Sequence, residues 1–348
     1  MRLAITADVH LRTYKDTPGR YRALENIFKQ ALDEKASTVL ICGDLFDKDF
    51  QNYSDFEKLA GHYPKLEIWI LPGNHDSNLS QKIFTDGNIR IFEKPEVIGD
   101  GVKFLIIPYL AGKTMGDLIG QFVDDIEAKK WVLCGHGDWL EGRRSPNPYE
   151  PGTYMPLTRS DLNQYQPIKV FLGHIHAWRN TPIHVPGSPC GLDISETGKR
   201  RFLLFDSDKN KVESRWVETE VTYQSCRLTV LPVEDEDEYI RQWSEKIKRI
   251  WDEDQPDQKK SRIRVQVQGV TQDKASLVKS LEKAFKGYPF YKDEEFDTSG
   301  LNVTLDQKRV RIAELVQKKI EELPPPASPD EPDHDQILLQ SLSLIFKE

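Results

Sequence analysis

The sequence predicts an α/β fold for about the first 200 residues, followed by a smaller α+β domain. Short apolar runs recur in the first part, each ending near Gly, Asp or His, and helical stretches such as RYRALENIFKQALDE lie between them. Runs that are apolar on both faces indicate buried central strands. The predicted strands are Leu3–Ala7, Thr38–Cys42, Leu66–Leu71, Val102–Ile107, Trp131–Cys134 and Lys169–Leu172.

The pattern changes after about residue 220. TYQSCRLTVLPV is strand-like, DEDEYIRQWSEKIKRIW helical, SRIRVQVQG alternating and KASLVKSLEKAF helical, an order that predicts a small α+β domain. DQKRVRIAELVQKKIEEL carries an apolar helical stripe, and PPPASPDEPDHD is too rich in Pro and acids to bury a core. We therefore expect a first domain at 1–220, a second at 221–300, a helix at 301–324, a linker at 325–335 and a terminal helix at 336–348.

Composition excludes some classes of protein. The 348 residues are 38% hydrophobic and carry a net charge of −8, which argues against a protein that coats nucleic acid unselectively. No run reaches the ~18 apolar residues of a membrane span, so we expect no membrane association. The start MRLAITADVH has no signal-peptide pattern, and the four cysteines are widely spaced as in a reduced cytosol, so we predict a cytoplasmic protein.

Five polar clusters follow five of the predicted strands and contain five of the eight histidines. In order they are D-V-H at 8–10, G-D-L-F-D at 43–47, G-N-H-D at 73–76, G-H at 135–136 and G-H-I-H at 173–176. Carboxylate, imidazole and amide ligands without thiolates suit Mn²⁺, Fe²⁺ or Zn²⁺. Asp-x-His and His-x-His place two ligands on one face of an extended segment. One such motif alone is commonly a turn, but the ordered set predicts a two-metal centre for displacement at phosphorus.

This ordered set resembles the calcineurin-like metallophosphoesterase superfamily. The resemblance implies a four-layer α/β/β/α sandwich with two divalent ions, for which we favour Mn²⁺, and a metal-activated hydroxide that attacks phosphorus. Matched motif by motif, Asp8, His10 and His176 would bind one ion and Asn74, His136 and His174 the other, with Asp44 bridging them.

The resemblance leaves His75 as the catalytic residue. Beside a bound phosphate, it could protonate the leaving oxygen or stabilise developing charge. Related phosphoesterases pair this histidine with the acid that stands here as Asp47, three residues after Asp44. Such a carboxylate favours the charged imidazolium and orients the ring, so we predict an Asp47–His75 dyad.

Within the superfamily, the closest pattern is that of SbcD-like DNA nucleases. Protein phosphatases have Arg where Lys48 stands, whereas GDLFD, GNHD, GHIH and HVPGSP resemble SbcD. Archaeal and eukaryotic relatives have His at the place of Asp47, which favours a bacterial or phage type. The regions that form the family's dimer interface are compact here, so a homodimer and a monomer are alternatives.

The resemblance also implies two macromolecular partners, DNA and an SMC-like ABC ATPase. We expect DNA phosphates to contact basic residues of two loops, Arg12, Lys15, Arg20 and Arg22 in the first and Arg143 and Arg144 in the second. The second domain corresponds to that family's DNA-contacting cap. QILLQSLSLIFKE is too short for a stable isolated helix. It therefore either binds the ATPase or docks on its own domain.

The leading interpretation is a metal-dependent DNA exonuclease or endonuclease subunit that acts with the ATPase in repair or recombination. One alternative is a small-molecule phosphodiesterase or phosphatase of the same superfamily, which would not need the second domain or the tethered terminal helix. Another is a non-catalytic scaffold for the ATPase, against which the complete ligand set argues.

Overall fold

The computed structural model describes residues 1–140, 152–231, 233, 235–254, 258–304, 306–326 and 331–346. The chain divides into two compact units. Met1–Leu192 with Lys199–Glu220 forms the first, and Asp193–Gly198 with Val221–Glu348 forms the second. None of the helices in the described ranges is long and apolar enough to cross a membrane.

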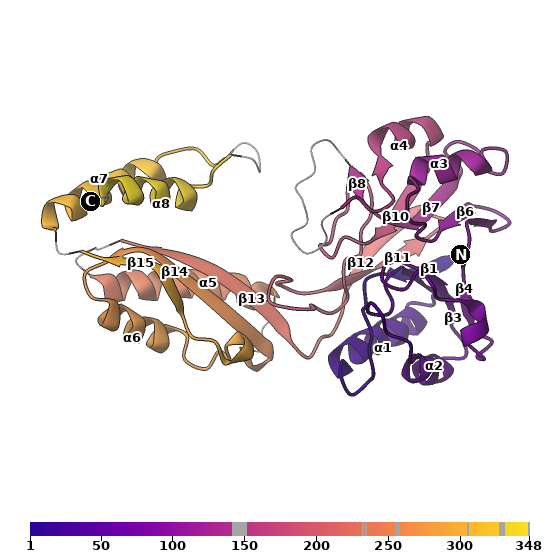
Figure 1. The fold of residues 1–348 in the computed structure, drawn as a ribbon, viewed down its shortest axis with the longest axis horizontal. Helices are drawn as coiled ribbons and strands as arrows, with labels where there is room; N and C mark the ends of the chain where they lie inside the picture. Colours follow the sequence, from indigo (N-terminus) through magenta and orange to yellow (C-terminus); the bar gives the residue numbers. More distant parts are fainter. Residues whose placement is uncertain are drawn as a thin grey trace. The chain divides into compact units, whose positions relative to one another are not determined.

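The first unit contains two β-sheets (Figure 1). One has the strand order β12-β11-β1-β2-β3-β4, in which β1 to β4 are parallel and β11 is antiparallel to β1. The other has the order β10-β7-β6-β5, with β10, β7 and β6 parallel. The strands are β1 (Arg2–Thr6), β2 (Thr38–Cys42), β3 (Glu67–Leu71), β4 (Ile89–Ile91), β5 (Glu96–Ile98), β6 (Lys103–Ile107), β7 (Trp131–His136), β10 (Lys169–Gly173), β11 (Arg201–Asp206) and β12 (Lys211–Trp216), with β8 (Trp139–Leu140) and β9 (Leu157–Thr158) paired separately.

Helices cover the outer faces of both sheets. Apolar residues of the two inner faces, such as Leu3 and Phe171, form one buried cluster between the sheets. A second cluster joins the first sheet to Phe28 and Phe56 of its covering helices, and a third joins the other sheet to Leu118. The helices are α1 (Pro18–Asp33), α2 (Ser54–Gly61), α3 (Met115–Ile119) and α4 (Arg159–Tyr165), with short 3-10 turns at Gln81–Ile83 and Gly120–Phe122. The predicted four-layer α/β/β/α sandwich is confirmed.

All six strands predicted for this unit are present, with ends that differ by at most two residues. Six further strands of the described residues, β4, β5, β8, β9, β11 and β12, were not predicted. β4 and β5 have three residues each, which is too short for a recognisable period. β12, KVESRW, carries mixed polar residues because it lies at a sheet edge.

The second unit is built on a three-stranded parallel sheet, β13-β14-β15. Alternate residues of β14, including Ile263, Val265 and Val267, pack against two helices in a buried cluster. The strands are β13 (Thr222–Val230), β14 (Ser261–Thr271) and β15 (Asp297–Val303), and the helices are α5 (Glu236–Asp254) and α6 (Lys274–Ala284), with short 3-10 turns at Gln258–Lys260 and Tyr291–Asp293. The alternation of SRIRVQVQG thus reflects one apolar and one polar sheet face.

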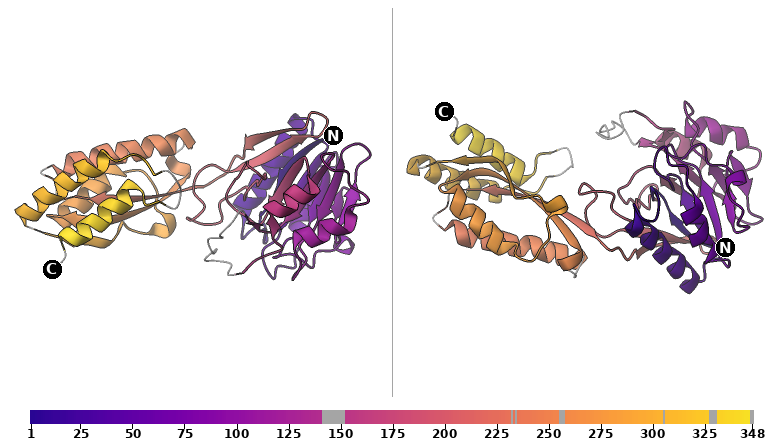
Figure 2. Two further views of the ribbon diagram at one scale, coloured as in Figure 1. Left: turned by 90° about the horizontal axis from the view of Figure 1, so that it is seen from above. Right: turned by 60° about the horizontal axis from the view of Figure 1, so that its bottom comes forward.

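Two more helices, α7 (Gln307–Glu321) and α8 (His334–Ile345), lie on the side of this sheet opposite α5 and α6 (Figure 2). Leu338 and Leu342 of α8 are buried against Ala313 and Ile320 of α7. The terminal segment therefore docks on its own unit, one of the two alternatives considered.

The predicted bounds in this region need correction. The expected helix over 301–324 begins only at Gln307, because Asp297–Val303 forms β15. DTSGLNV has few strand-forming residues, and its conformation depends on pairing with β14. The expected linker over 325–335 ends earlier, since α8 begins at His334 behind an Asp333 capping box.

Candidate metal centre

The five polar clusters lie at the carboxyl ends of five strands. β1, β2 and β3 are neighbours in the first sheet, and β7 and β10 are neighbours in the second. Because carboxyl ends of parallel strands meet at one edge of a sheet, the side chains that follow them are brought together. Asp8 and His10 follow β1, Asp44 and Asp47 follow β2, Asn74 and His75 follow β3, His136 ends β7, and His174 and His176 follow β10.

The backbone turns sharply at these strand ends. Asp8, His10, Asp44 and His174 have φ of 54°, 53°, 52° and 88°, in the left-handed region that non-glycine residues seldom adopt. Each such residue costs on the order of 1–3 kcal/mol and persists where surrounding structure fixes it. A Cβ on Gly43 would overlap the ring of His136, so a side chain there would displace a candidate ligand.

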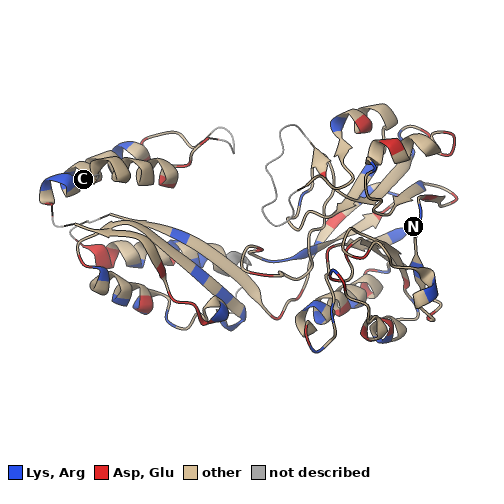
Figure 3. Ribbon diagram, viewed as in Figure 1, with Lys and Arg blue, Asp and Glu red and all other residues tan. Residues whose placement is uncertain are grey.

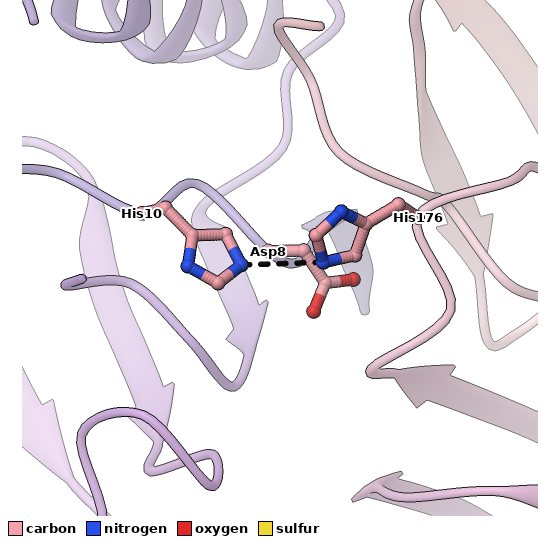
Figure 4. Close-up of side chains that lie close together, drawn as sticks. All are labelled: Asp8, His10 and His176. Carbon is pink, nitrogen blue, oxygen red and sulfur yellow. Dashed lines mark hydrogen bonds between the residues drawn. The ribbon is translucent and has the colours of Figure 1, made fainter. Parts of the chain in front are cut away.

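Asp8, His10 and His176 form the first cluster (Figure 4). The Nε2 atoms of His10 and His176 face each other at 3.2 Å. One Asp8 oxygen accepts the His174 backbone N–H at 2.9 Å. Its other oxygen is buried with no hydrogen-bond partner in the described part of the chain. Burial raises the pKa of Asp8 to about 6, although the nearby imidazoles of His176 and His136 lower it. A bound cation would pair with the second Asp8 oxygen.

Asp44, His136 and His174 form the second cluster, together with Asn74. Asn74 Oδ1 lies 2.8 Å from His136 Nε2 and 3.1 Å from His174 Nδ1. His136 Nδ1 donates to the carbonyl of Cys42 at 2.9 Å. This hydrogen bond holds the ring with Nε2 directed at the cluster, as carbonyl partners do for metal-binding histidines.

Asp44 lies next to both clusters. Its Oδ2 is 3.4 Å from His136 Nε2 and 3.9 Å from His10 Nε2, while its Oδ1 accepts the His75 backbone N–H at 2.9 Å. Burial raises the pKa of Asp44, but the neighbouring imidazoles, His136 foremost, hold it well below its usual range. The residue is therefore a buried anion shared by two groups of imidazoles.

The donor set fits two divalent cations. Burial lowers the pKa of His10 to about 3, so its imidazole is neutral near pH 7, the form that binds metals. The four cysteines are free thiols, and none belongs to a candidate cluster among the described residues. Nitrogen and oxygen donors without sulfur suit Mn²⁺, Fe²⁺ or Zn²⁺. Two bound ions would supply Lewis-acid activation of a phosphoester and of water.

His75 and Asp47 lie beside the two clusters. His75 Nδ1 is 3.8 Å from Asp47 Oδ1, an ion-pair separation longer than a hydrogen bond, and the rings of His75 and His10 meet edge to face at 4.7 Å. The adjacent His75 is the main cause that holds the pKa of Asp47 below its usual range. Arg12 Nε lies closer, 3.1 Å from Asp47 Oδ2. The expected pair is thus a group of three, with Arg12 as the additional cation.

Further residues hold the ligands in place. Asp76 accepts the backbone N–H groups of Gly73 and Phe46 at 2.6 and 3.1 Å, which ties the GNHD turn to the segment after β2. Asp138 Oδ1 lies 3.6 Å from His174 Nε2.

A further residue, Arg200, also holds a candidate ligand in place. Arg200 donates to the backbone carbonyl of His176 at 2.6 Å. Asp138 was not predicted, although its place two residues after His136 is a local signal. Arg200 has no such signal, because it is far from His176 in the sequence.

The basic residues predicted to contact DNA have differing surroundings. Arg20 donates to the carbonyl of His10, and Arg22 pairs with Glu220, so both guanidinium groups have partners within this unit. Arg12 is paired with Asp47 but its side chain is 54% exposed, and Lys15 is exposed. Arg143 and Arg144 lie outside the described residues.

Fold and site define a phosphoester hydrolase with a metal-binding centre. The family model described as "Calcineurin-like phosphoesterase" matches residues 1–208, and the chain belongs to this family.

Similarity to individual proteins is weaker. A DNA double-strand break repair protein Mre11 of Methanosarcina mazei is 29% identical over 115 residues, which are 29% of this chain and only 19% of that protein. Among solved structures, a novel archaeal phosphodiesterase matches 62% of this chain and all of its own, at 15% identity and a TM-score of 0.34. The nuclease MPE of Pseudomonas putida matches 61% of this chain and 87% of its own, at 14% identity and a TM-score of 0.29.

Divalent metal should stabilise the folded protein through this centre. Binding to the native state at a free concentration of about 100 times Kd contributes about 2.7 kcal/mol, so Mn²⁺ should raise Tm over the EDTA-treated protein. Asp44→Asn should abolish most of this shift because it removes the shared anion. Glu127→Gln, at an exposed carboxylate, is the control and should keep the shift. Equal shifts in the two variants would contradict the assignment.

Proposed function

We propose that the protein is a metal-dependent DNA nuclease of the SbcD-like type, which hydrolyses phosphodiester bonds with two divalent ions, Mn²⁺ being the favoured metal. The observation that carries the proposal is the Asp44 carboxylate, which lies next to both histidine clusters. A bridging carboxylate suits two cations that act together at phosphorus. The likeness of part of the chain to a DNA double-strand break repair protein supports DNA as the substrate class.

Metal ligands and catalyst keep the roles expected from the sequence in this proposal. Asp8, His10 and His176 would hold one ion, Asn74, His136 and His174 would hold the other, and Asp44 would be shared by both. His75 stays off the ions and protonates the leaving oxygen. Its backbone N–H bond to Asp44 fixes its distance from the bridging ligand. Asp47 orients the imidazole and favours its charged form, and Arg12 shares that carboxylate.

The second unit supports a polymeric substrate rather than a small ester. Its sheet has a polar face, because Arg262, Arg264 and Gln266 alternate with buried residues along β14. Arg227 of β13 is exposed and lies opposite Gln266 in register. Figure 3 shows basic residues along these strands. Arg264 is ion-paired with Glu294 at 2.7 Å, so backbone phosphates would contact this face chiefly through Arg227 and Arg262, with modest sequence preference. We place further phosphate contacts at Lys15 and Arg12 in the first unit.

Two alternatives have less support. A small-molecule phosphodiesterase or phosphatase needs the metal centre but not a second unit with a basic sheet face. A scaffold without activity would not need eight polar residues assembled around one buried carboxylate. The four free thiols agree with the reducing cytoplasm in which we place the protein.

We also propose an SMC-like ABC ATPase as partner, bound by the outer surface of α7 and α8. The inner surface of these helices is buried in their own unit. Ile312 and Leu315 of α7 are nevertheless 50% and 59% exposed, and Leu344 of α8 is 70% exposed. Apolar residues one helical turn apart on an exposed surface suit a helical partner such as a coiled coil.

Incubation with Mn²⁺ and linear duplex DNA, alongside bis-p-nitrophenyl phosphate, tests the proposed activity. We expect cleavage of both substrates, and His75→Ala should lower the rate by roughly 10²–10⁴-fold through loss of the general acid. His62→Ala, at an exposed histidine of the same unit, is the matched control. Hydrolysis of the small ester alone would favour the small-molecule alternative, and hydrolysis of neither would favour the scaffold.

Asp47→Asn separates catalysis from metal binding. Because Asp47 orients His75 and is not a proposed metal ligand, kcat should fall by roughly 10–100-fold, while the Kd for Mn²⁺ from calorimetry should change far less. Asp49→Asn, at an exposed acid of the same loop, should change neither quantity. A parallel loss of kcat and metal affinity in Asp47→Asn would instead make Asp47 part of the metal site.

Substitution of the exposed α7 residues tests the ATPase partner. Ile312→Asp with Leu315→Asp should abolish co-elution with the SMC-like ATPase of the source organism in size-exclusion chromatography. Nuclease activity and Tm should remain, because both side chains point to solvent. Lys318→Asp, also exposed on α7, controls for added negative charge. Co-elution of the double variant would refute this surface as the interface.

A further inference from the structure

Two exposed tryptophans of the first unit enclose an arginine. The guanidinium carbon of Arg201 lies 3.9 Å from the ring centroid of Trp216 and 4.4 Å from that of Trp178. Lys199 Nζ lies 5.4 Å from the same Trp216 ring. These four residues come from three separate segments of the chain, and we call them the tryptophan platform.

The platform lies beside the metal centre. Trp178 is two residues from His176, a proposed ligand. β11 is antiparallel to β1 with Ile5 opposite Leu203, so Arg201, two residues earlier, lies level with the end of β1 where Asp8 follows. Trp216 is directly opposite Arg201 on β12. The register thus places the platform at the same end of the sheet as the candidate ligands.

The exposure of the platform residues is unusual within the chain. Trp178 and Trp216 are 40% and 45% exposed, whereas the other five tryptophans are buried or partly buried. Two wide apolar rings left in water near a catalytic site commonly mark a binding surface. Packing alone would explain buried indoles, but it does not explain these.

No carboxylate of the described residues forms an ion pair with Arg201 or Lys199. Elsewhere in the unit, Arg90 also stacks on a ring, 4.5 Å from the Phe92 centroid, but its charge is paired with Glu96 at 2.7 Å. Arg201 and Lys199 therefore present positive charge beside aromatic surface, and the complementary ligand carries both an anion and a flat ring.

We propose that the tryptophan platform binds unpaired nucleotides of the nucleic-acid strand that enters the metal centre. A base stacks on exposed indole surface, while Arg201 and Lys199 contact the adjacent phosphates. Single-strand binding proteins combine stacking aromatics and cations in this way. The inference rests on the proposed nuclease function and deepens it, because it makes a single-stranded end, rather than intact duplex, the form of substrate held at the centre.

Binding of an oligo(dT) of about ten nucleotides in EDTA tests the platform without turnover. Tryptophan fluorescence should be quenched on binding, because the exposed indoles are the ones that stack. Trp178→Leu and Trp216→Leu should each raise Kd about tenfold, and Arg201→Ala should also weaken binding. Trp178→Phe should retain most of the affinity, since it keeps an aromatic face. Arg90→Ala, whose stacked guanidinium is already ion-paired, is the matched control and should bind as the wild type does.

An abasic oligonucleotide of equal length and charge distinguishes stacking from phosphate contact. It should bind at least about tenfold more weakly than oligo(dT). Equal affinity for the two, or unchanged Kd in both Trp→Leu variants, would overturn the proposal. If those variants bind normally while the wild type cleaves DNA, the platform fails and the nuclease stands. If tryptophan-dependent binding occurs but the wild type cleaves no DNA with Mn²⁺, the platform stands and the nuclease fails.

Discussion

The first unit depends on one buried anion, the carboxylate of Asp44. A charge at 1% exposure is costly unless it is paired and hydrogen-bonded. Here the His75 N–H satisfies one oxygen, while His136 and His10 approach the other from the two clusters. Strands of both sheets must end within a few ångströms of this group. The layered fold is the means by which residues more than a hundred positions apart converge there.

Convergence requires local backbone strain, which the packed sheets sustain. Four candidate ligands or their neighbours adopt left-handed backbone angles, a cost that regular strands would avoid. Gly73 is needed because a Cβ there would overlap the Asp44 carboxylate, and Gly43 has a φ of +85°. The glycines before the polar residues therefore allow two chain segments to lie in close contact, and their role is not to make the backbone flexible. This requirement explains why the motifs read as Gly followed by a ligand.

Much of the fold and centre could be predicted because its signals are local. Apolar runs give the central strands, and each ligand stands within a few residues of a strand end. Contacts set by tertiary packing give no such signal. The pairing of Arg12 with Asp47 across the site was not predicted. β15 has no strand pattern of its own and is defined by β14. Arg201 lies between two tryptophans because of the register of β11 and β12, and the sequences of these two strands do not show that register.

The same electrostatics connect the centre to its surroundings. The net charge of −8 disfavours attraction to DNA at a distance, so binding has to come from local positive charge. The centre holds buried carboxylates, and burial raises the pKa of Asp8. Divalent ions held there would make the local charge of this region more positive. Beside it, Arg201 and Lys199 remain uncompensated within the described residues. Local positive charge at the metal end of the sheets would then direct the scissile bond to the centre, while the phosphate contacts proposed for the second unit hold the rest of the strand.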